Sequence, residues 1–389
     1  MKNRFWKSFL TLSLLSIVLL SPEVLLAQKG PFPKDRISFV GQISNDEEGR
    51  ELSYPAYVWI DPNRKEIYVV EGRGSIVVYN ERFFPLFSLG PGQGVESAQG
   101  LMIDRGGFLW VAQAPGLNNR RGRISIFDRC LNWKKDVYLS GFEGADEFTP
   151  FRLAENSKGE IFVVGAYSPL VLILDTLGNV DGTLSHEVEA EGARKRVMLN
   201  DVLVGPDDRL YFLSEETSHV YVYDTNRRFL FEFGQKGGST GKMSRPQGLD
   251  IERRSGNFFI VDYMRHAITV YDPKGNFIYE FGGLGWGEGW LQYPKDITID
   301  RSGKVFIADT FNNRIQVLQL KDASAGDLIR DQTAGEEEAT AKGSVPEEAR
   351  NKPGFVAVPR EKTTEKEGSS LLLDVLPTLP PEKQGNKTK

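Results

Sequence analysis

The chain has 389 residues, a formal net charge of −5 at pH 7 and a single cysteine, Cys130. This mildly acidic balance provides no basic surface for a phosphate backbone, which argues against nucleic-acid binding. One cysteine excludes an intramolecular disulfide. The 40 glycines and the 11% of aromatic residues are typical of short, half-buried strands that are joined by tight turns.

The N-terminal segment has the pattern of an export signal. Three basic residues precede an apolar stretch at residues 9–20, and Ala27 offers a small residue for cleavage. We therefore expect residues 1–27 to be a secretory signal peptide, and the protein to be periplasmic or extracellular. The alternative is a retained N-terminal anchor, for which the apolar stretch is short. The mature chain is expected to have no transmembrane span.

A unit of about 45 residues then recurs along the chain, which indicates a repeat architecture. Six copies lie between Phe39 and Leu320. Each copy joins two apolar runs through a polar turn, as in residues 299–309, and a third and fourth run follow without helical periodicity. Four short strands per unit are typical of a propeller blade. The expected fold class is therefore all-β, a six-bladed β-propeller of four-stranded antiparallel blades over residues 34–321.

The two ends of the repeat array complement each other. The sixth copy stops after its third run, near Leu320, whereas residues 36–41 resemble the fourth run at residues 278–282. We expect this N-terminal strand to complete the last blade. Such closure leaves no blade with an unpaired edge.

The best copies of the unit resemble a known repeat. Residues 294–317 read Pro-x-x-Ile-x-Ile-Asp-x-x-Gly-x-Val-Phe-Ile-Ala-Asp-x-x-Asn-Asn-Arg-Ile-Gln-Val, and residues 246–271 are a second good match. Both resemble the NHL repeat, and the chain is similar to exported bacterial NHL repeat proteins. The first four copies lack the Asn-Asn-Arg-Ile element. The resemblance implies a propeller and, for function, chiefly a binding scaffold with a few enzymes.

Superposing the copies places one set of residues at the start of every innermost strand, where six loops meet at the mouth of the central channel. The polar members of this set are candidates for contacts with a ligand or partner: Tyr57, Arg152, Asn200, Asp201, Lys295 and Asp296. Arg152 can pair with either aspartate, and two carboxylates near the axis can hold a Ca²⁺. Alternatively, these groups bind channel waters and the amides at strand ends.

A second set of candidates for partner binding lies on loops. Trp286 and Trp290 stand in the glycine-rich linker before the sixth copy, and Arg265 and His266 occupy a turn of the fifth. Aromatic and arginine side chains on the loops of a rigid scaffold are common anchors of protein interfaces. Alternatively, Trp290 packs between neighbouring blades.

Asp262 and Asp309, which end the second run of the last two copies, have a structural interpretation. An aspartate in this position is expected to accept hydrogen bonds from the turn that follows it. Asp309 is also expected to form an ion pair with Arg314, which would fix the blade.

Enzymatic functions find less support in the sequence. Some relatives of NHL proteins are zinc-dependent lyases, which need converging histidines, but His186, His219 and His266 occupy non-equivalent positions in the copies. A calcium-dependent hydrolase or lactonase with its site at the channel mouth is the main alternative. Nucleophile elbows, phosphate loops and His-carboxylate motifs are absent from the sequence, so we assign no catalytic residue, metal ligand or cofactor.

The sequence changes character after Lys321. Charged residues, Thr and Pro dominate residues 322–389, which are expected to form a disordered acidic and Lys-rich tail. Its apolar stretches at 354–358 and 371–381 are candidates for a short docking motif, or are incidental. The whole sequence predicts an exported, non-enzymatic scaffold that binds a protein or peptide partner in the cell envelope through loops on one face of a propeller.

Overall fold

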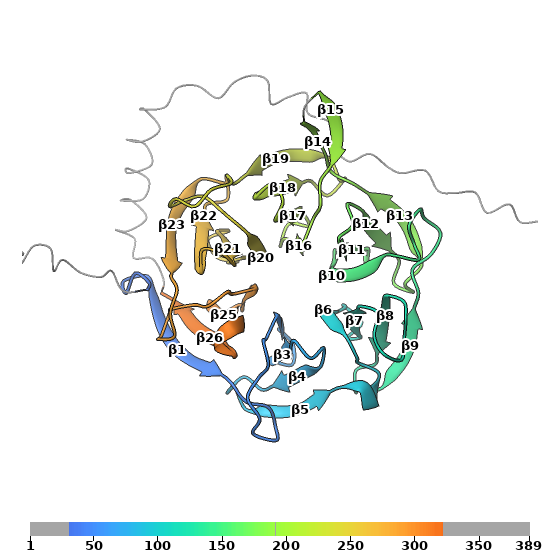
Figure 1. Ribbon diagram of the computed structural model, residues 1–389, viewed down its shortest axis with the longest axis horizontal. Coiled ribbons are helices and arrows are strands. Elements are labelled where there is room, and N and C mark those ends of the chain that lie inside the picture. Colours follow the sequence, from blue (N-terminus) through green and yellow to red (C-terminus); the bar gives the residue numbers. More distant parts are fainter. Residues whose placement is uncertain (1–30, 191, 322–389) are drawn as a thin grey trace, which may run out of the picture.

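The computed structural model describes residues 31–190 and 192–321. The expected signal peptide and the expected tail lie outside these residues. Six four-stranded antiparallel sheets surround a central channel, as Figure 1 shows. The predicted fold class is therefore confirmed.

The first three blades follow one another along the chain, each from its innermost to its outermost strand. Blade one consists of β2 (Tyr57–Asp61), β3 (Glu66–Val70), β4 (Ile76–Tyr79) and β5 (Pro85–Leu89). Blade two consists of β6 (Ala98–Ile103), β7 (Leu109–Gln113), β8 (Arg123–Phe127) and β9 (Trp133–Val137). Blade three consists of β10 (Thr149–Glu155), β11 (Ile161–Ala166), β12 (Val171–Leu174) and β13 (Val180–Leu184).

The last three blades have the same internal order, except that the final strand of blade six comes from the N-terminus. Blade four consists of β16 (Asp201–Val204), β17 (Leu210–Ser214), β18 (His219–Tyr223) and β19 (Phe229–Phe233). Blade five consists of β20 (Pro246–Ile251), β21 (Phe258–Asp262), β22 (Ala267–Tyr271) and β23 (Phe277–Gly282). Blade six consists of β24 (Asp296–Ile299), β25 (Lys304–Asp309), β26 (Arg314–Leu320) and β1 (Ile37–Ile43).

The ring closes through β1, as predicted. This strand pairs antiparallel with β26, from Ile37 opposite Leu320 to Ile43 opposite Ile315, with a bulge after Phe39. The outermost strand of blade six is therefore the first strand of the propeller along the chain. Closure of this kind joins blade six to blade one through the chain itself.

The Asp-x-x-Gly turns explain why the third and fourth strands of a blade form hairpins. In blade five, the Asp272 carboxylate accepts hydrogen bonds from the amides of Lys274 and Asn276, both at 2.8 Å. Gly275 has a φ of +84°, and a Cβ there would lie 2.4 Å from the Phe233 side chain of the preceding blade. Glycine therefore satisfies both the turn and the close packing of two blades.

The hydrophobic core lies between neighbouring blades and not inside any one of them. One cluster joins Tyr68 and Val78 of blade one with Leu101 and Val111 of blade two, and similar clusters join the other pairs of blades. Blades five and six share a cluster that includes Ile37. Each blade is therefore stabilised mainly through its neighbours, as in other radial repeats.

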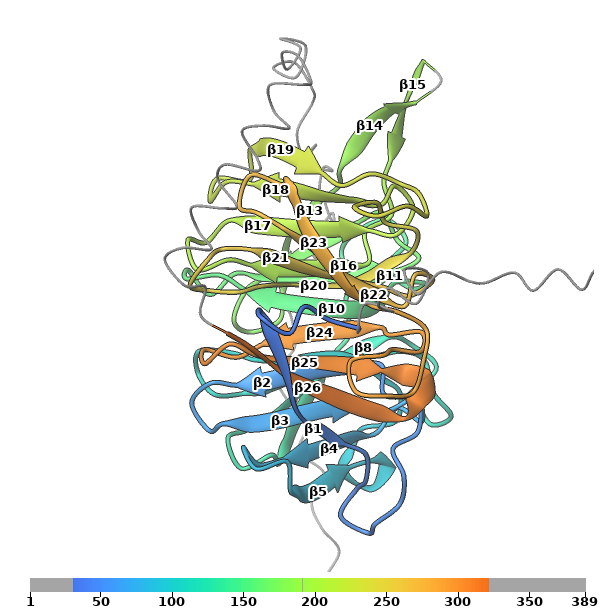
Figure 2. The same cartoon turned by 90° about the vertical axis from the view of Figure 1, so that its left-hand side faces the viewer.

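One element was not expected from the sequence. The strands β14 (Glu187–Ala190) and β15 (Ala193–Arg196) form a hairpin that projects from the disc between blades three and four (Figure 2). Glu187 and Arg196 form an ion pair at 3.7 Å across it. The residues of β15 are exposed, so the segment lacks the apolar alternation that identifies a half-buried strand.

Helices are nearly absent from the described part of the chain. Only short 3₁₀ helices occur there, η2 (Pro91–Gln93) and η3 (Thr310–Asn312). Within residues 31–190 and 192–321, none is long and apolar enough to cross a membrane.

The closing strand can be tested by a single substitution. Ile37 is 1% exposed, so Ile37→Ala leaves a cavity in the core between blades five and six. It is expected to lower the free energy of unfolding by about 2–5 kcal/mol, measured by denaturant titration. Val40 lies on the same strand and is 42% exposed, so Val40→Ala should change stability by less than about 0.5 kcal/mol. Equal effects of the two substitutions would contradict closure by β1.

Candidate functional site at the channel mouth

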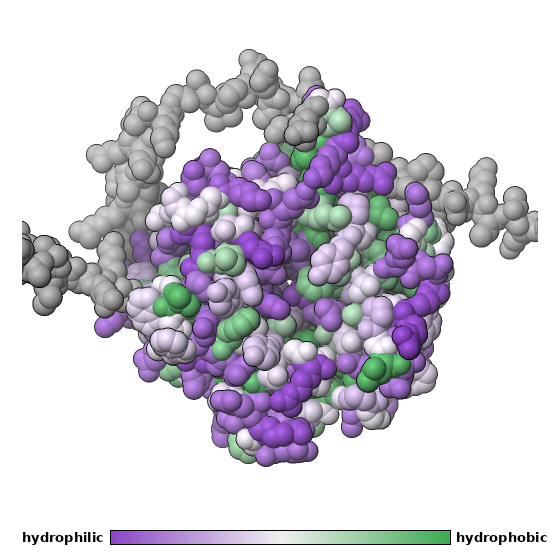
Figure 3. Space-filling model, in the orientation of Figure 1, coloured by the Kyte–Doolittle hydropathy of each residue, from purple (hydrophilic) through white to green (hydrophobic). Residues whose placement is uncertain are grey.

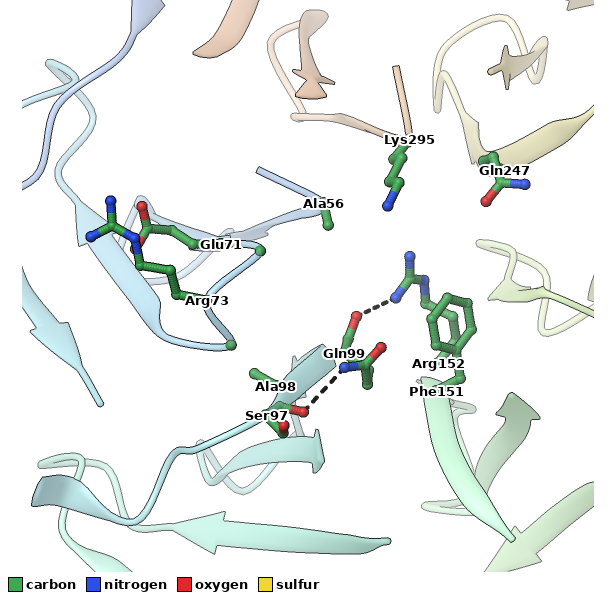
Figure 4. Close-up of a pocket in the computed structure, with 12 residues that line it drawn as sticks. Ala56, Glu71, Arg73, Ser97, Ala98, Gln99, Phe151, Arg152, Gln247 and Lys295 are labelled. Carbon is green, nitrogen blue, oxygen red and sulfur yellow. Dashed lines mark hydrogen bonds between the residues drawn. The ribbon is translucent and has the colours of Figure 1, made fainter. Parts of the chain in front are cut away.

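The six innermost strands begin at the same end of the channel, and side chains from all parts of the ring converge there. The predicted channel residues Tyr57, Arg152, Asp201 and Asp296 are all buried. They come from blades one, three, four and six, so only ring closure brings them together. Figure 4 shows the neighbourhood of Arg152 and Lys295 at this mouth.

Arg152 is the central member of the group. It is 4% exposed, and one terminal nitrogen of its guanidinium donates a hydrogen bond to the Gln99 carbonyl of blade two. Its Nε lies 4.0 Å from Oδ1 of Asp201, so the predicted pairing with an aspartate involves Asp201. The guanidinium also lies 4.4 Å from the ring centre of Tyr57 and 4.0 Å from that of Phe151, where cation–π attraction stabilises it.

The aspartates bind backbone amides of the next blade. Asp201 accepts a hydrogen bond from the Leu249 amide of blade five at 2.9 Å, and Asp296 accepts one from the Val58 amide of blade one at 2.8 Å. Asp250 likewise accepts a hydrogen bond from the amide of Ile299 in blade six, at 2.6 Å. These three carboxylates therefore link the innermost strands of successive blades.

Tyr57 and Asn200 add two further links. The Tyr57 hydroxyl donates a hydrogen bond to the Leu101 carbonyl of blade two at 3.0 Å. The Asn200 amide donates to the carbonyls of Pro246 and Gln247 in blade five, each at 3.2 Å. Together with the Arg152 contacts, every pair of adjacent blades is joined by a polar contact of an innermost strand. The aspartates thus bind backbone amides, as in the structural interpretation, whereas Tyr57, Asn200 and Arg152 bind backbone carbonyls.

Burial dominates the electrostatics of this group. It raises the pKa of Asp201 to about 6, although the Arg152 guanidinium opposes the rise. Burial also raises the pKa of Asp296 well above its usual range, again against the effect of Arg152. The pKa of Lys295 is lowered, first by burial and then by the positive charge of Arg152. The two cations at the mouth therefore repel each other.

A cavity of about 240 Å³ opens above Arg152. Lys295, Gln99, Gln247 and Phe151 line it, and exposed Arg73 lies at its rim. In Figure 4 the Lys295 amine and the Arg152 guanidinium point toward each other across this space. Figure 3 shows a small opening at the centre of the disc, with hydrophobic and hydrophilic residues interspersed around it.

The four loop candidates differ in their surroundings. Trp286 is 77% exposed, whereas half-buried Trp290 packs against the glycines of its own linker. Arg265 donates hydrogen bonds to the Ser239 carbonyl at 2.8 Å and to Glu280 at 2.7 Å, so it ties a linker to the outer strand of blade five. His266 Nδ1 accepts a hydrogen bond from the Tyr293 amide at 3.0 Å, and burial lowers its pKa.

A row of aromatic rings around His266 was not found from the sequence. The ring of Tyr54 lies 5.4 Å from that of Phe311, which lies 4.9 Å from Tyr293. The Tyr293 ring lies 4.9 Å from Tyr263 and 4.5 Å from the His266 ring. We refer to these five residues as the aromatic row. It crosses blades one, six and five beside the channel mouth, and Tyr54 and Phe311 are 52% and 44% exposed.

The aromatic row contains three backbone outliers. Tyr54, Tyr293 and His266 have φ values of +49°, +50° and +55°. Each of the two tyrosines directly precedes a proline that lies two residues before an innermost strand. Left-handed backbone is uncommon for a large side chain. The repeated Tyr-Pro dipeptide is the sequence signal that could have identified the row.

The aspartates at the end of the second strand have the expected structural role. Asp262 accepts hydrogen bonds from the amides of Met264 and Arg265, both at 3.1 Å. Asp309 pairs with Arg314 at 2.8 Å in buried surroundings. Both predictions are confirmed.

The described residues contain no cluster of three or more His, Cys, Asp or Glu side chains that could hold a metal ion. The three histidines have different partners: His186 contacts the Tyr223 hydroxyl, His219 contacts the Thr217 carbonyl, and His266 belongs to the aromatic row. This agrees with their non-equivalent positions in the repeats.

The raised pKa of Asp201 leads to a testable pH dependence. Since its folded-state pKa of about 6 exceeds the unfolded value of about 3.9, its contribution to stability is fully present below about pH 4 and is lost as the pH rises through 6. Asp201→Asn removes this loss. The variant should therefore gain stability relative to the wild type between about pH 4 and pH 7, measured by denaturant unfolding. Parallel pH profiles of the two proteins would show that this group is not perturbed.

Comparison with known proteins identifies the repeat. Residues 291–318 match the model of the NHL repeat. No protein of curated function shows significant similarity to the sequence. Among solved structures, a protein of unknown function from Bacteroides thetaiotaomicron is similar over 74% of this chain and 76% of its own, with a TM-score of 0.54 at 12% identity.

Two further structures share the fold. An auxiliary nutrient binding protein from Bacteroides ovatus is similar over 74% of this chain and 77% of its own, with a TM-score of 0.53 at 13% identity. A streptogramin B lyase is similar over 74% and 99%, with a TM-score of 0.50 at 12% identity. Identities this low establish the fold alone. The protein is therefore a six-bladed β-propeller that carries an NHL repeat in its closing blade.

Proposed function

We propose that the protein is a non-enzymatic scaffold that binds a protein or peptide through the channel-mouth face of its propeller. The observation that carries this proposal is the aromatic row. Large aromatic rings at the surface of a rigid scaffold provide much contact area at a low entropic cost, and they dominate the energetics of many interfaces.

The backbone of the row supports a functional role. Tyr54 and Tyr293 hold left-handed φ values that cost stability, and such strain is concentrated at binding and catalytic sites. Hydrogen bonds keep both residues in place: the Tyr54 amide donates to Asn313, and the Tyr293 amide donates to His266. The rings are thereby presented in a fixed arrangement before a partner arrives, which reduces the entropy lost on binding.

The channel mouth offers less to an enzyme. Asp201 and Asp296, the carboxylates that a calcium-dependent hydrolase would use, are bound to backbone amides of neighbouring blades. Both a nutrient-binding protein and a lyase occur among the structures of this fold, so the fold itself does not favour either class. The aromatic row, and not the fold, therefore supports the binding role.

We expect this binding to take place outside the cytoplasm. The basic residues, the apolar stretch and Ala27 form the pattern of a cleaved secretory signal. When the full chain is produced in a bacterial host, the mature protein should begin at Gln28 and appear in the periplasmic fraction or the medium. Intact mass and N-terminal sequencing measure this. A protein that keeps Met1 and stays in the membrane pellet would support the retained anchor instead.

Binding by the aromatic row can be tested with peptides. Purified full-length protein is used to select binders from a random peptide display library, and their Kd values are measured by calorimetry. Phe311→Ser and Tyr54→Ser should each weaken binding by about 2 kcal/mol, or roughly thirtyfold. Phe84→Ser is the matched control, because Phe84 is 67% exposed in the turn before β5, away from the row. Failure to enrich any peptide, or equal losses in the control, would refute the proposal.

A further inference from the structure

The cavity at the channel mouth is lined by two buried or half-buried cations. Of these two, only Arg152 has a carboxylate of the described residues within ion-pair distance, Asp201 at 4.0 Å. Lys295 is half-buried, and within the described chain its amine has no hydrogen-bond or ion-pair partner. Arg152 is almost completely buried, and its Nε has no hydrogen bond. Both side chains point into the same space, as Figure 4 shows.

Lys295 does not stabilise the fold. A half-buried lysine beside an arginine is destabilising, because burial and like charge both disfavour its protonated form. The nearby carboxylates have other partners: Asp201 and Asp296 accept hydrogen bonds from the amides of Leu249 and Val58, and Glu71, which also lines the cavity, accepts them from the Ser53 amide and the Ser75 hydroxyl. Within the described residues, none of them forms an ion pair with Lys295. An unfavourable charge pair that lines a cavity is typical of a site that is completed by a ligand of opposite charge.

The surroundings indicate the class of that ligand. Three cations, Arg73, Arg152 and Lys295, and the carboxylate Glu71 line the cavity, and Asp201 lies 4.0 Å from Arg152. The site therefore has a small positive charge, which suits a monoanion better than a dianion. Planar guanidinium groups match the two oxygens of a carboxylate. The Phe151 ring, which also lines the cavity, offers an apolar wall for the carbon atoms next to that carboxylate.

We propose that the channel mouth binds a carboxylate group between Arg152 and Lys295. A free organic monoanion and the C-terminus of a peptide share this chemistry, and the cavity of about 240 Å³ is large enough for either head group. This site is distinct from the aromatic row, so it does not depend on the function proposed above.

The experiment uses the full-length protein and isothermal titration calorimetry. The probes are acetate, benzoate, N-acetylated tripeptides with a free C-terminal carboxylate, the same tripeptides as C-terminal amides, and inorganic phosphate. We expect at least one carboxylate probe to bind the wild type. The C-terminal amide of a tripeptide that binds should not bind. Binding of acetate or benzoate would identify a free monoanion as the ligand, whereas binding of tripeptide acids alone would identify a peptide C-terminus.

Lys295→Gln is the decisive variant. It should lower the affinity for the carboxylate probe at least about tenfold, which corresponds to about 1.4 kcal/mol. Lys295→Arg keeps the positive charge and should retain binding. Because the substitution removes a repulsive charge, the melting temperature should stay constant or rise, which a merely structural residue would not show. Lys134→Gln, at an exposed lysine of β9, is the control and should leave affinity unchanged.

Three results would overturn the proposal. One is that no carboxylate probe binds the wild type, or that Lys295→Gln binds it as tightly as the wild type does. Another is that phosphate binds more tightly than every carboxylate. The third is a clear fall in melting temperature for Lys295→Gln, which would mean that this side chain has a structural partner.

Discussion

The structure depends on the contacts between neighbouring blades. The hydrophobic clusters lie between sheets, and each sheet buries its faces only when both neighbours are present. Around the channel, polar side chains add a second set of links, such as Asp296 to the Val58 amide and Asp201 to the Leu249 amide. The pairing of β1 with β26 completes both sets, because it holds blade six as a full sheet between blades five and one. Every other feature, the channel mouth included, requires this closed ring.

Much of the fold could be predicted from the sequence because the unit is repeated. Periodicity reveals the blades, and the missing fourth run of the last copy reveals the role of residues 36–41. Superposing copies also placed Tyr57, Arg152, Asp201 and Asp296 at one mouth, since equivalent positions of a radial repeat lie on a circle. The β14–β15 hairpin escaped this reasoning because β15 is exposed and shows no alternation of apolar and polar residues.

The candidate site could be predicted only in part. Repeat alignment locates positions relative to the axis, but it does not show which side chain bonds to which backbone amide of the next blade. The aromatic row combines residues from different kinds of loop in three blades, and the contact of Tyr54 with Phe311 forms only when blade six meets blade one. Lys295 occupies an aligned position of the repeat. The alignment does not show that it lies beside Arg152, or that the nearby aspartates bind backbone amides of other blades. Residues that differ between the copies of the repeat therefore carry the functional information, whereas residues that the copies share are explained by packing.

The closing strand also determines how the domain responds to load. The Lys321 amide donates a hydrogen bond to the Arg36 carbonyl at 2.8 Å, so the two ends of the propeller leave it side by side. In the antiparallel β1–β26 ladder, Ile37 faces Leu320 at this same end. Tension between the two termini would therefore separate the ladder one rung at a time, as a zipper opens, instead of shearing all its hydrogen bonds at once. A propeller that is pulled at both ends would therefore lose the β1–β26 pairing first, and the other blades would come under load only after that.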